Sequence, residues 1–133
     1  MNMKIIALAT GVLALAACDT TKPNDPEMLK GAQFTTELNG VPVTLDFDAT
    51  SPRVFGKIVN NYNGQYQADE TKISFGPFAS TMMMGPQNMM DAEREYFQFM
   101  STTDTYVLKE NTLKIKNTDG KEIVFKRLNT TAQ

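Results

Sequence analysis

The sequence predicts a mainly β domain, a small antiparallel structure that is largely a meander, with one helix covering its open side. Runs of alternating apolar and polar residues recur between turn residues, as is typical of half-buried strands. One segment instead repeats its apolar residues at helical spacing. The chain has 133 residues, of which 41% are hydrophobic and 21% charged, and this suits a single folded domain.

The first two expected strands form a hairpin. Residues 33–38 and 41–47 flank Asn39-Gly40, a pair that favours a type I′ turn because both central positions need a positive φ. Six more strands are expected, with Gly64 inside the second of them: 52–59, 62–67, 71–78, 104–109, 112–116 and 121–127. The segment 60–64 between two of these strands is rich in asparagine, and Asn60 is interpreted as part of a turn.

A single helix is expected from Asn88 to Met100. Asn88 can cap its N-terminus, with Asp91 three positions further on. Apolar residues cover one half of the helix surface and polar residues the other, but Glu93 falls inside the apolar half. A carboxyl group in apolar surroundings can have a raised pKa and act as a general acid. We favour a structural role for Glu93, as a buried acceptor of hydrogen bonds from nearby donors.

The N-terminus has the pattern of an export signal. A short positive start precedes the apolar run 5–17, which is too short for the ~20 residues that span a bilayer. The run ends in Leu15-Ala16-Ala17-Cys18, a bacterial lipobox, and Cys18 is the only cysteine of the chain. We expect a signal peptide over 1–17, cleavage after Ala17, and acyl chains such as palmitate on Cys18. An ordinary secretory signal with an incidental cysteine is the alternative.

These features predict a lipoprotein that is anchored to a membrane of the cell envelope and faces the periplasm. Two or three acyl chains anchor a protein stably, because each buried methylene contributes about 0.8 kcal/mol. Residues 18–32 are expected to form the lipidated tether, 33–128 the domain and 129–133 a C-terminal tail. Asp19 resembles the inner-membrane retention signal of enteric bacteria, a rule that other bacteria do not follow. The inner and the outer membrane are therefore both compatible with the sequence.

Composition excludes several classes of site. The chain has no histidine and a single cysteine, which excludes a Ser-His-Asp triad, a Cys-His dyad, a thiolate zinc site and an internal disulfide. A formal net charge of −2 offers no attraction for nucleic acid. We therefore expect a monomer without enzymatic activity or cofactor, whose partners are the membrane and envelope proteins.

Five methionines lie between positions 82 and 90. Thioethers are soft ligands suited to Cu(I), but methionine also fills irregular space under a helix. We favour packing, with Met83 and at least one of Met89 and Met90 buried against aromatic rings, and with Met82 and Met84 pointing outward. A second candidate is the pair Asp46 and Asp48 on one strand face, which could bind a cation weakly but is more typical of solvated charges.

Two stretches resemble a known family. One runs from Gly56 to Tyr66 and reads GKIVNNYNGQY; the other runs from Ile73 to Pro86 and reads ISFGPFASTMMMGP, followed by a helix with Met90-x-x-Glu93. In order and spacing they resemble the META domain, the family of HslJ-like bacterial envelope lipoproteins. The family often has cysteines at the positions of Val59 and Gly85, so a bridge that they could form in relatives is missing here.

The resemblance implies a lipocalin-like, partly open barrel with a role in envelope stress, drug tolerance or secretion, and it supplies no catalytic residues. A non-enzymatic binding or accessory protein is the leading hypothesis. The alternatives are a carrier of an apolar ligand inside the barrel and, more weakly, Cu(I) binding by the methionines. An interior packed shut favours protein contacts, whereas an open apolar pocket favours a carrier.

Overall fold

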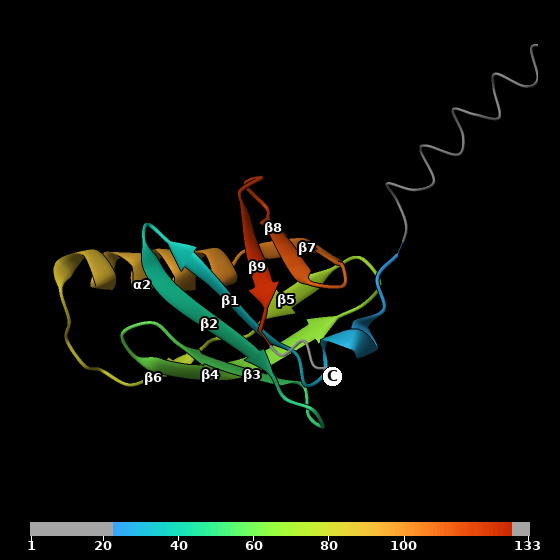
Figure 1. The fold of residues 1–133 in the computed structure, drawn as a ribbon, viewed down its shortest axis with the longest axis horizontal. Helices are drawn as coiled ribbons and strands as arrows, with labels where there is room; N and C mark the ends of the chain where they lie inside the picture. Colours follow the sequence, from blue (N-terminus) through green and yellow to red (C-terminus); the bar gives the residue numbers. More distant parts are fainter. Residues whose placement is uncertain (1–22, 129–133) are drawn as a thin grey trace, which may run out of the picture.

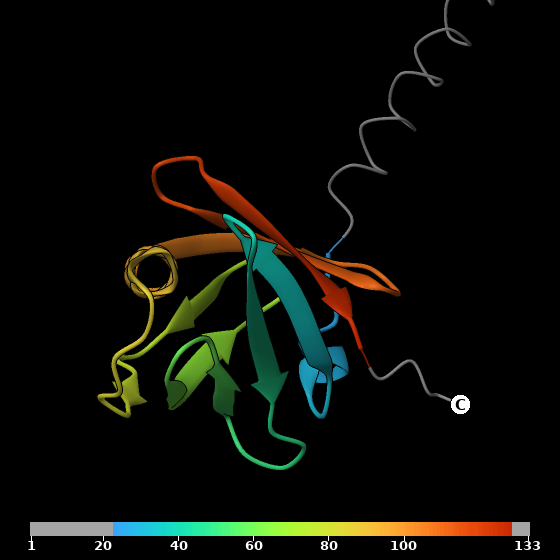
Figure 2. The same cartoon turned by 60° about the vertical axis from the view of Figure 1, so that its left-hand side comes forward.

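Eight strands follow one another in an antiparallel sheet that curls into a nearly closed barrel (Figures 1 and 2). This computed structural model describes residues 23–128, and the spatial order of the strands is β5-β4-β3-β2-β1-β9-β8-β7. A further short strand, β6, pairs with β4. The bounds are β1 Gln33–Leu38, β2 Val41–Phe47, β3 Arg53–Lys57, β4 Asn61–Ala68, β5 Ile73–Phe75, β6 Ala79–Ser80, β7 Thr103–Leu108, β8 Thr112–Asn117 and β9 Glu122–Arg127. The predicted mainly β fold with one covering helix is confirmed.

The β1–β2 hairpin has the predicted bounds and turn. Asn39 has a φ of 54° and Gly40 a φ of 81°, the positive values that a type I′ turn requires. Along β2, buried residues alternate with more exposed ones, so one face of the strand packs inside the barrel.

The expected strand 71–78 is shorter in the structure. β5 ends at Phe75: the Gly76 N–H still donates to the Gln65 carbonyl (2.9 Å), but Pro77 has no N–H with which to continue the pairing. The chain resumes pairing with β4 only at β6. The barrel closes weakly between β5 and β7, through a single bridge between Lys72 and Thr105.

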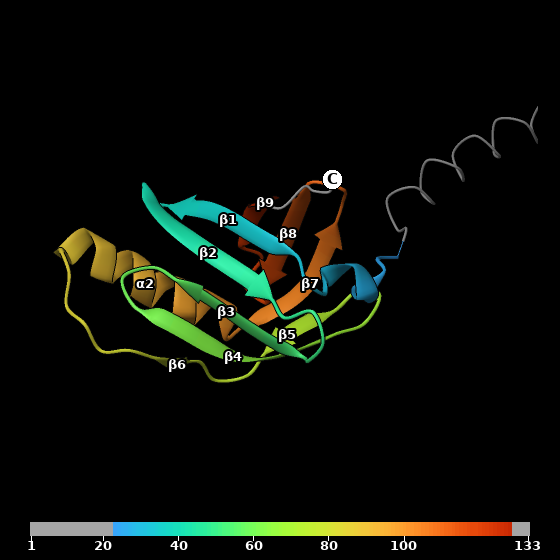
Figure 3. The same cartoon turned by 60° about the horizontal axis from the view of Figure 1, so that its bottom comes forward.

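Helix α2 (Gln87–Met100) covers the open side of the barrel, alongside the sheet (Figure 3). Its N-cap is Pro86 rather than Asn88, so the predicted cap is wrong. Pro86 already has an extended backbone, and Asn88 lies in the first turn with an exposed side chain. Asp91 accepts hydrogen bonds from Gln87 and Arg94 instead of completing a capping box. The buried residues of α2 face the barrel: Ala92, Glu93, Tyr96, Phe99 and Met100.

The expected tether is partly folded onto the domain. A 3-10 helix, η1 (Pro26–Leu29), packs against one end of the barrel, and Leu29 and Ala32 belong to the core. Asn24 is also bonded to the barrel, so residues 24–32 belong to the domain rather than to a tether. Cys18, the predicted signal peptide and the tail 129–133 lie outside the described residues.

Aromatic rings fill much of the space between sheet and helix. Consecutive rings contact one another across the barrel, from Phe34 and Phe47 to Tyr66, and from Phe78 through Tyr62 and Tyr96 to Phe125. Such pairs contribute beyond the apolar area that they bury. Within residues 23–128, no helix is both long and apolar enough to cross a membrane.

Candidate functional site

Glu93 is buried where α2 packs against the β3–β4 connection. Its side chain is 7% exposed. One carboxylate oxygen accepts hydrogen bonds from the backbone N–H groups of Val59 (3.2 Å) and Asn60 (2.9 Å), and the other accepts one from the Asn60 side-chain amide (3.0 Å). The predicted buried carboxylate tied to donors is confirmed. Three N–H groups replace its hydration, which is what a buried carboxylate needs.

Asn60 connects this carboxylate to the methionine segment. Its side-chain oxygen accepts from the Met83 N–H (2.6 Å) and the Thr81 hydroxyl (2.7 Å), while its side-chain nitrogen donates to the Met83 carbonyl (3.2 Å). The amide thus pairs with the backbone of Met83 in both directions, as a neighbouring strand would. Asn60 lies in the connection between β3 and β4, where a turn residue is expected, but it is only 2% exposed and also bridges three segments of the fold.

The three methionines that follow lie on the surface. We name Met82–Met84 the Met loop; its side chains are 89%, 52% and 85% exposed in chain order. The outward direction of Met82 and Met84 is confirmed, but the predicted burial of Met83 is wrong. Asn60 bonds the N–H and the carbonyl of Met83, which fixes the Met83 backbone while its side chain stays 52% exposed. Of the other candidates, Met89 packs against the core but is only half-buried, so the expected burial of Met89 or Met90 is met in part.

Comparison with known proteins decides the family. The family model of the META domain matches residues 25–130. The chain belongs to the META domain family. An NMR structure of a protein from Burkholderia xenovorans has a TM-score of 0.65 at 18% identity and covers 80% of this chain and 90% of its own. A second NMR structure has a TM-score of 0.64 at 14% identity, covering 80% and 97%. These identities show a shared fold alone. No curated protein matches the sequence.

In this META domain, Val59 and Gly85, the two positions for which the family resemblance suggests cysteines, lie side by side. A Cβ atom placed on Gly85 would lie 3.1 Å from Cγ1 of Val59. Val59 follows β3 and donates its N–H to Glu93, and Gly85 directly follows the Met loop. The Glu93–Asn60 network therefore holds together the same two segments that a bridge between these positions would join.

Two glycines of the META domain permit close approach to aromatic groups. A Cβ atom on Gly64 would lie 2.6 Å from the ring of Phe78, which packs 4.8 Å from the ring of Tyr62. A Cβ atom on Gly56 would collide with the Thr44 carbonyl and would lie 2.6 Å from the Tyr62 hydroxyl. Gly64, which lies inside the expected strand, is thus a structural residue.

A pair of tyrosine hydroxyls lies below the site, and sequence reasoning missed it. The Tyr62 hydroxyl donates to the Thr44 carbonyl (2.6 Å), which leaves the Tyr96 hydroxyl to donate to Tyr62 (2.7 Å). Burial raises the pKa of Tyr62 and raises the pKa of Tyr96 well above the ordinary value. Neutral hydroxyls are therefore built into the core.

One oxygen of the Asp48 carboxylate is occupied by hydrogen bonds within its own loop. This oxygen accepts four hydrogen bonds, from the backbone N–H groups and hydroxyls of Thr50 and Ser51, and these bonds lower the pKa of Asp48. Burial instead raises the pKa of Asp46. The described residues contain no group of three or more His, Cys, Asp or Glu side chains that could hold a metal ion.

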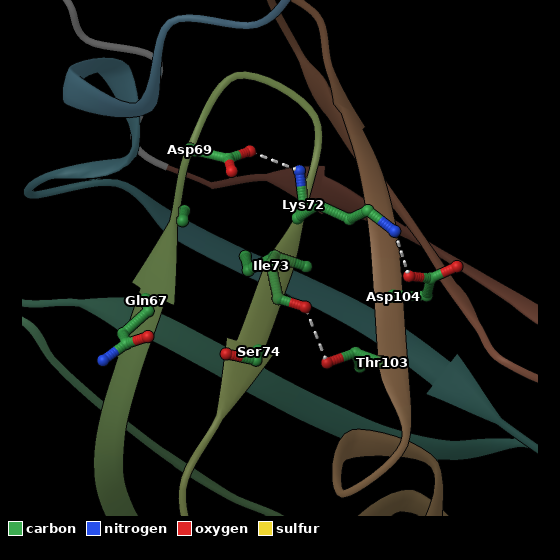
Figure 4. A pocket seen from close by; sticks show the side chains of 8 residues that line it. Gln67, Asp69, Lys72, Ile73, Ser74, Thr103 and Asp104 are labelled. Atoms are coloured by element: carbon green, nitrogen blue, oxygen red, sulfur yellow. Dashed lines mark hydrogen bonds and ion pairs between the residues drawn. The ribbon is translucent and has the colours of Figure 1, made fainter.

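A polar pocket lies at the seam between β5 and β7 (Figure 4). Its volume is about 340 Å³, and an ion pair between Lys72 and Asp104 (2.8 Å) crosses it. The Thr103 hydroxyl donates to the Ile73 carbonyl (3.0 Å) in the same gap. A second pocket of about 340 Å³ lies between η1, the β2–β3 loop and Tyr66. Both have polar as well as apolar walls, unlike the apolar barrel interior that a carrier would need.

Proposed function

We propose that this META-domain protein is a lipid-anchored component of the cell envelope that acts by binding other molecules at its surface and catalyses no reaction. The observation that carries the proposal is the packed interior. The rings between sheet and helix contact one another at centroid distances from 4.8 to 6.5 Å, so the barrel core is occupied by its own side chains. Accessory roles in envelope stress, drug tolerance or secretion fit such a protein.

The N-terminal pattern supports membrane attachment. The lipobox ends at Cys18, and Asn24, which is bonded to the barrel, follows it by six positions. Six residues span at most about 20 Å when fully extended. A lipidated Cys18 would thus keep the domain within about 20 Å of the bilayer surface.

The anchor is tested by replacing Cys18 with Ser in the full chain. We expect an unprocessed precursor that takes up no labelled palmitate, because the acceptor thiol is gone. The matched control is Ser at another small position of the signal, Ala9→Ser, which should be processed and labelled normally. Processing and membrane partitioning of Cys18→Ser like wild type would overturn the anchor.

One titration distinguishes a protein that binds molecules at its surface from a carrier that holds an apolar ligand inside the barrel. Full-length protein in detergent-free vesicles is titrated with a fluorescent fatty acid. The packed core predicts no stoichiometric binding beyond that of empty vesicles. Saturable binding at one equivalent, lost when Gly64→Ala forces Phe78 to move, would instead establish the carrier.

A further inference from the structure

The last hairpin of the sheet, β8–β9, carries a charge opposite to that of the rest of the domain. Residues 109–127 contain six basic and three acidic side chains, whereas residues 23–108 contain five basic and eleven acidic ones. Positive charge is therefore concentrated in this hairpin and the turn before it, in a chain whose formal net charge is −2. A local patch of this kind attracts anionic partners that the protein as a whole does not.

The centre of this charge lies on the outer face of the barrel. Buried and more exposed residues alternate along β8, so Lys114 faces outward between the inward-facing Leu113 and Ile115. Lys114 pairs across the sheet with Val107 of β7 on one side and Val124 of β9 on the other. The two valine side chains are 42% and 49% exposed. One row of the outer face thus consists of a lysine between two exposed valines.

Two further lysines lie in the next row of the same face. The Lys109 N–H donates to the Thr112 carbonyl (2.9 Å), and Thr112 is the register partner of Lys126. Within residues 23–128, none of the three lysines forms a salt bridge. Their charges are therefore available to a partner. We name this surface the basic face, and its residues are Val107, Lys109, Lys114, Val124 and Lys126.

The chain segment that leads to the predicted anchor joins the domain beside the basic face. The Asn24 side chain accepts from the Leu108 N–H (2.8 Å) and donates to the Tyr106 carbonyl (2.9 Å), so it lies against the edge of β7. A lipid on Cys18 would hold this edge within about 20 Å of the bilayer. A second contact of the domain with the same bilayer is then intramolecular, and a high effective concentration strengthens a weak attraction.

We propose that the basic face docks on anionic phospholipid headgroups of the bilayer in which the chain is anchored. Each basic residue near an anionic bilayer contributes about 5-fold in affinity, and the exposed valines add apolar surface between the lysines. The adjoining anchor segment favours the bilayer over an acidic protein, because it brings this side of the domain to the membrane. The inference deepens the proposed function and rests on its lipid anchor.

The test attaches the full chain to a bilayer chemically, so that it does not depend on acylation in the cell. The Cys18 thiol, the only one of the chain, is coupled to a maleimide lipid in nanodiscs of phosphatidylcholine, with or without phosphatidylglycerol. Lipid with a spin-labelled headgroup broadens nearby ¹³C-methyl resonances. We expect broadening of Val107 and Val124 in the anionic nanodiscs alone, while Met84, 85% exposed in the Met loop, keeps its intensity. Absence of palmitate on Cys18 in cells would count against the anchor, whereas the nanodisc result concerns the basic face alone.

Charge substitutions make the assignment specific. The triple variant Lys109→Gln with Lys114→Gln and Lys126→Gln should lower the ratio of docked to undocked protein about 100-fold and remove the broadening. The matched control changes the net charge equally on α2 and on β3, which is on the side of the barrel away from β8 (Figure 2). It should broaden like wild type and carries Arg53→Gln, Lys57→Gln and Arg94→Gln.

Three results would overturn the docking of the basic face. The first is equal broadening of both valines in neutral and anionic nanodiscs, which would show that charge is not involved. The second is no broadening in either kind of nanodisc, as expected if the basic face binds an acidic protein instead. The third is broadening in the triple lysine variant as strong as that in the control.

Discussion

Two asparagine side chains replace missing strand partners in this domain. One lies where the described chain begins and the other in the β3–β4 connection, and these two segments are at opposite ends of the domain (Figures 1 and 3). At the seam end, where the described chain begins, Asn24 accepts from the Leu108 N–H (2.8 Å) and donates to the carbonyls of Tyr106 (2.9 Å) and Glu70 (2.8 Å). At the other end, Asn60 makes the equivalent pair of bonds with Met83. A primary amide can do this because it carries the same donor and acceptor as a peptide group.

The two asparagines differ in burial and in their charged partner. Asn24 is half-exposed and bonds only to the backbone, so water can replace its bonds. Asn60 is 2% exposed and also bonds the Glu93 carboxylate. Loss of a buried partner leaves unpaired groups that water does not reach, which costs more than loss of an exposed one. The hydrogen bonds of Asn60, at the end of the domain that carries the Met loop (the Met-loop end), should therefore contribute more to stability than those of Asn24.

The Met-loop end can also be tied covalently. Val59→Cys with Gly85→Cys, in a Cys18→Ser chain, should form a disulfide, because these positions are in contact. Closing a loop of this length stabilises a protein by about 3 kcal/mol. Urea unfolding with and without reductant measures the difference. Gly85→Cys alone should destabilise, since its Cβ meets the Val59 methyl at 3.1 Å. An unbridged double variant would show that the contact is misplaced.

Removal of Glu93 measures the buried network. Glu93→Ala leaves the N–H groups of Val59 and Asn60 without this acceptor and should cost about 1–3 kcal/mol in the free energy of unfolding. The matched control is Glu95→Ala, two positions along the same helix, whose carboxylate bonds Asn39 and Lys121 at the surface. Surface pairs contribute about 0–1 kcal/mol. Equal losses in the free energy of unfolding for Glu93→Ala and Glu95→Ala would refute the larger contribution of the buried network.

Alkaline pH tests the hydroxyl pair beneath the Met-loop end. The pKa values of Tyr62 and Tyr96 are raised, so above pH 10 the unfolded chain loses these protons first and stability falls as the pH rises. At pH 11 the loss is about 1 kcal/mol for each tyrosine. Tyr96→Phe should give a shallower fall between pH 9 and 11. An unchanged slope in that variant would mean that Tyr96 ionises normally in the folded protein.

The smallest loss of stability is expected from substitutions at the seam end, where Asn24 bonds to β7. Asn24→Ala removes bonds that water can partly replace and should cost about 1 kcal/mol. Asn24→Asp keeps the acceptor for Leu108 but loses the donors to Tyr106 and Glu70, so it should be no better than Ala. Thermal unfolding of both variants checks this. A loss for Asn24→Ala larger than that for Glu93→Ala would reverse the proposed ranking.

Local patterns in the sequence predicted much of the fold. The β1–β2 hairpin could be predicted with its bounds, because Asn39-Gly40 encodes the turn and alternation encodes the faces. The burial of Glu93 could be predicted from its place on the helix. The exposure of Met83 and the role of Asn24 could not, since both depend on side-chain bonds across the fold. Asn24 and Leu108 are 84 positions apart, and no periodicity reports such a contact.

Amide hydrogen exchange tests most directly whether each asparagine acts as a strand partner. In the wild-type protein, the amides of Met83 and Leu108 should both be protected, although the Met83 side chain is 52% exposed. Asn60→Ala should release the Met83 amide and leave that of Leu108 protected, and Asn24→Ala should do the reverse. Exchange of the Met83 amide at the unprotected rate in the wild-type protein would contradict the account.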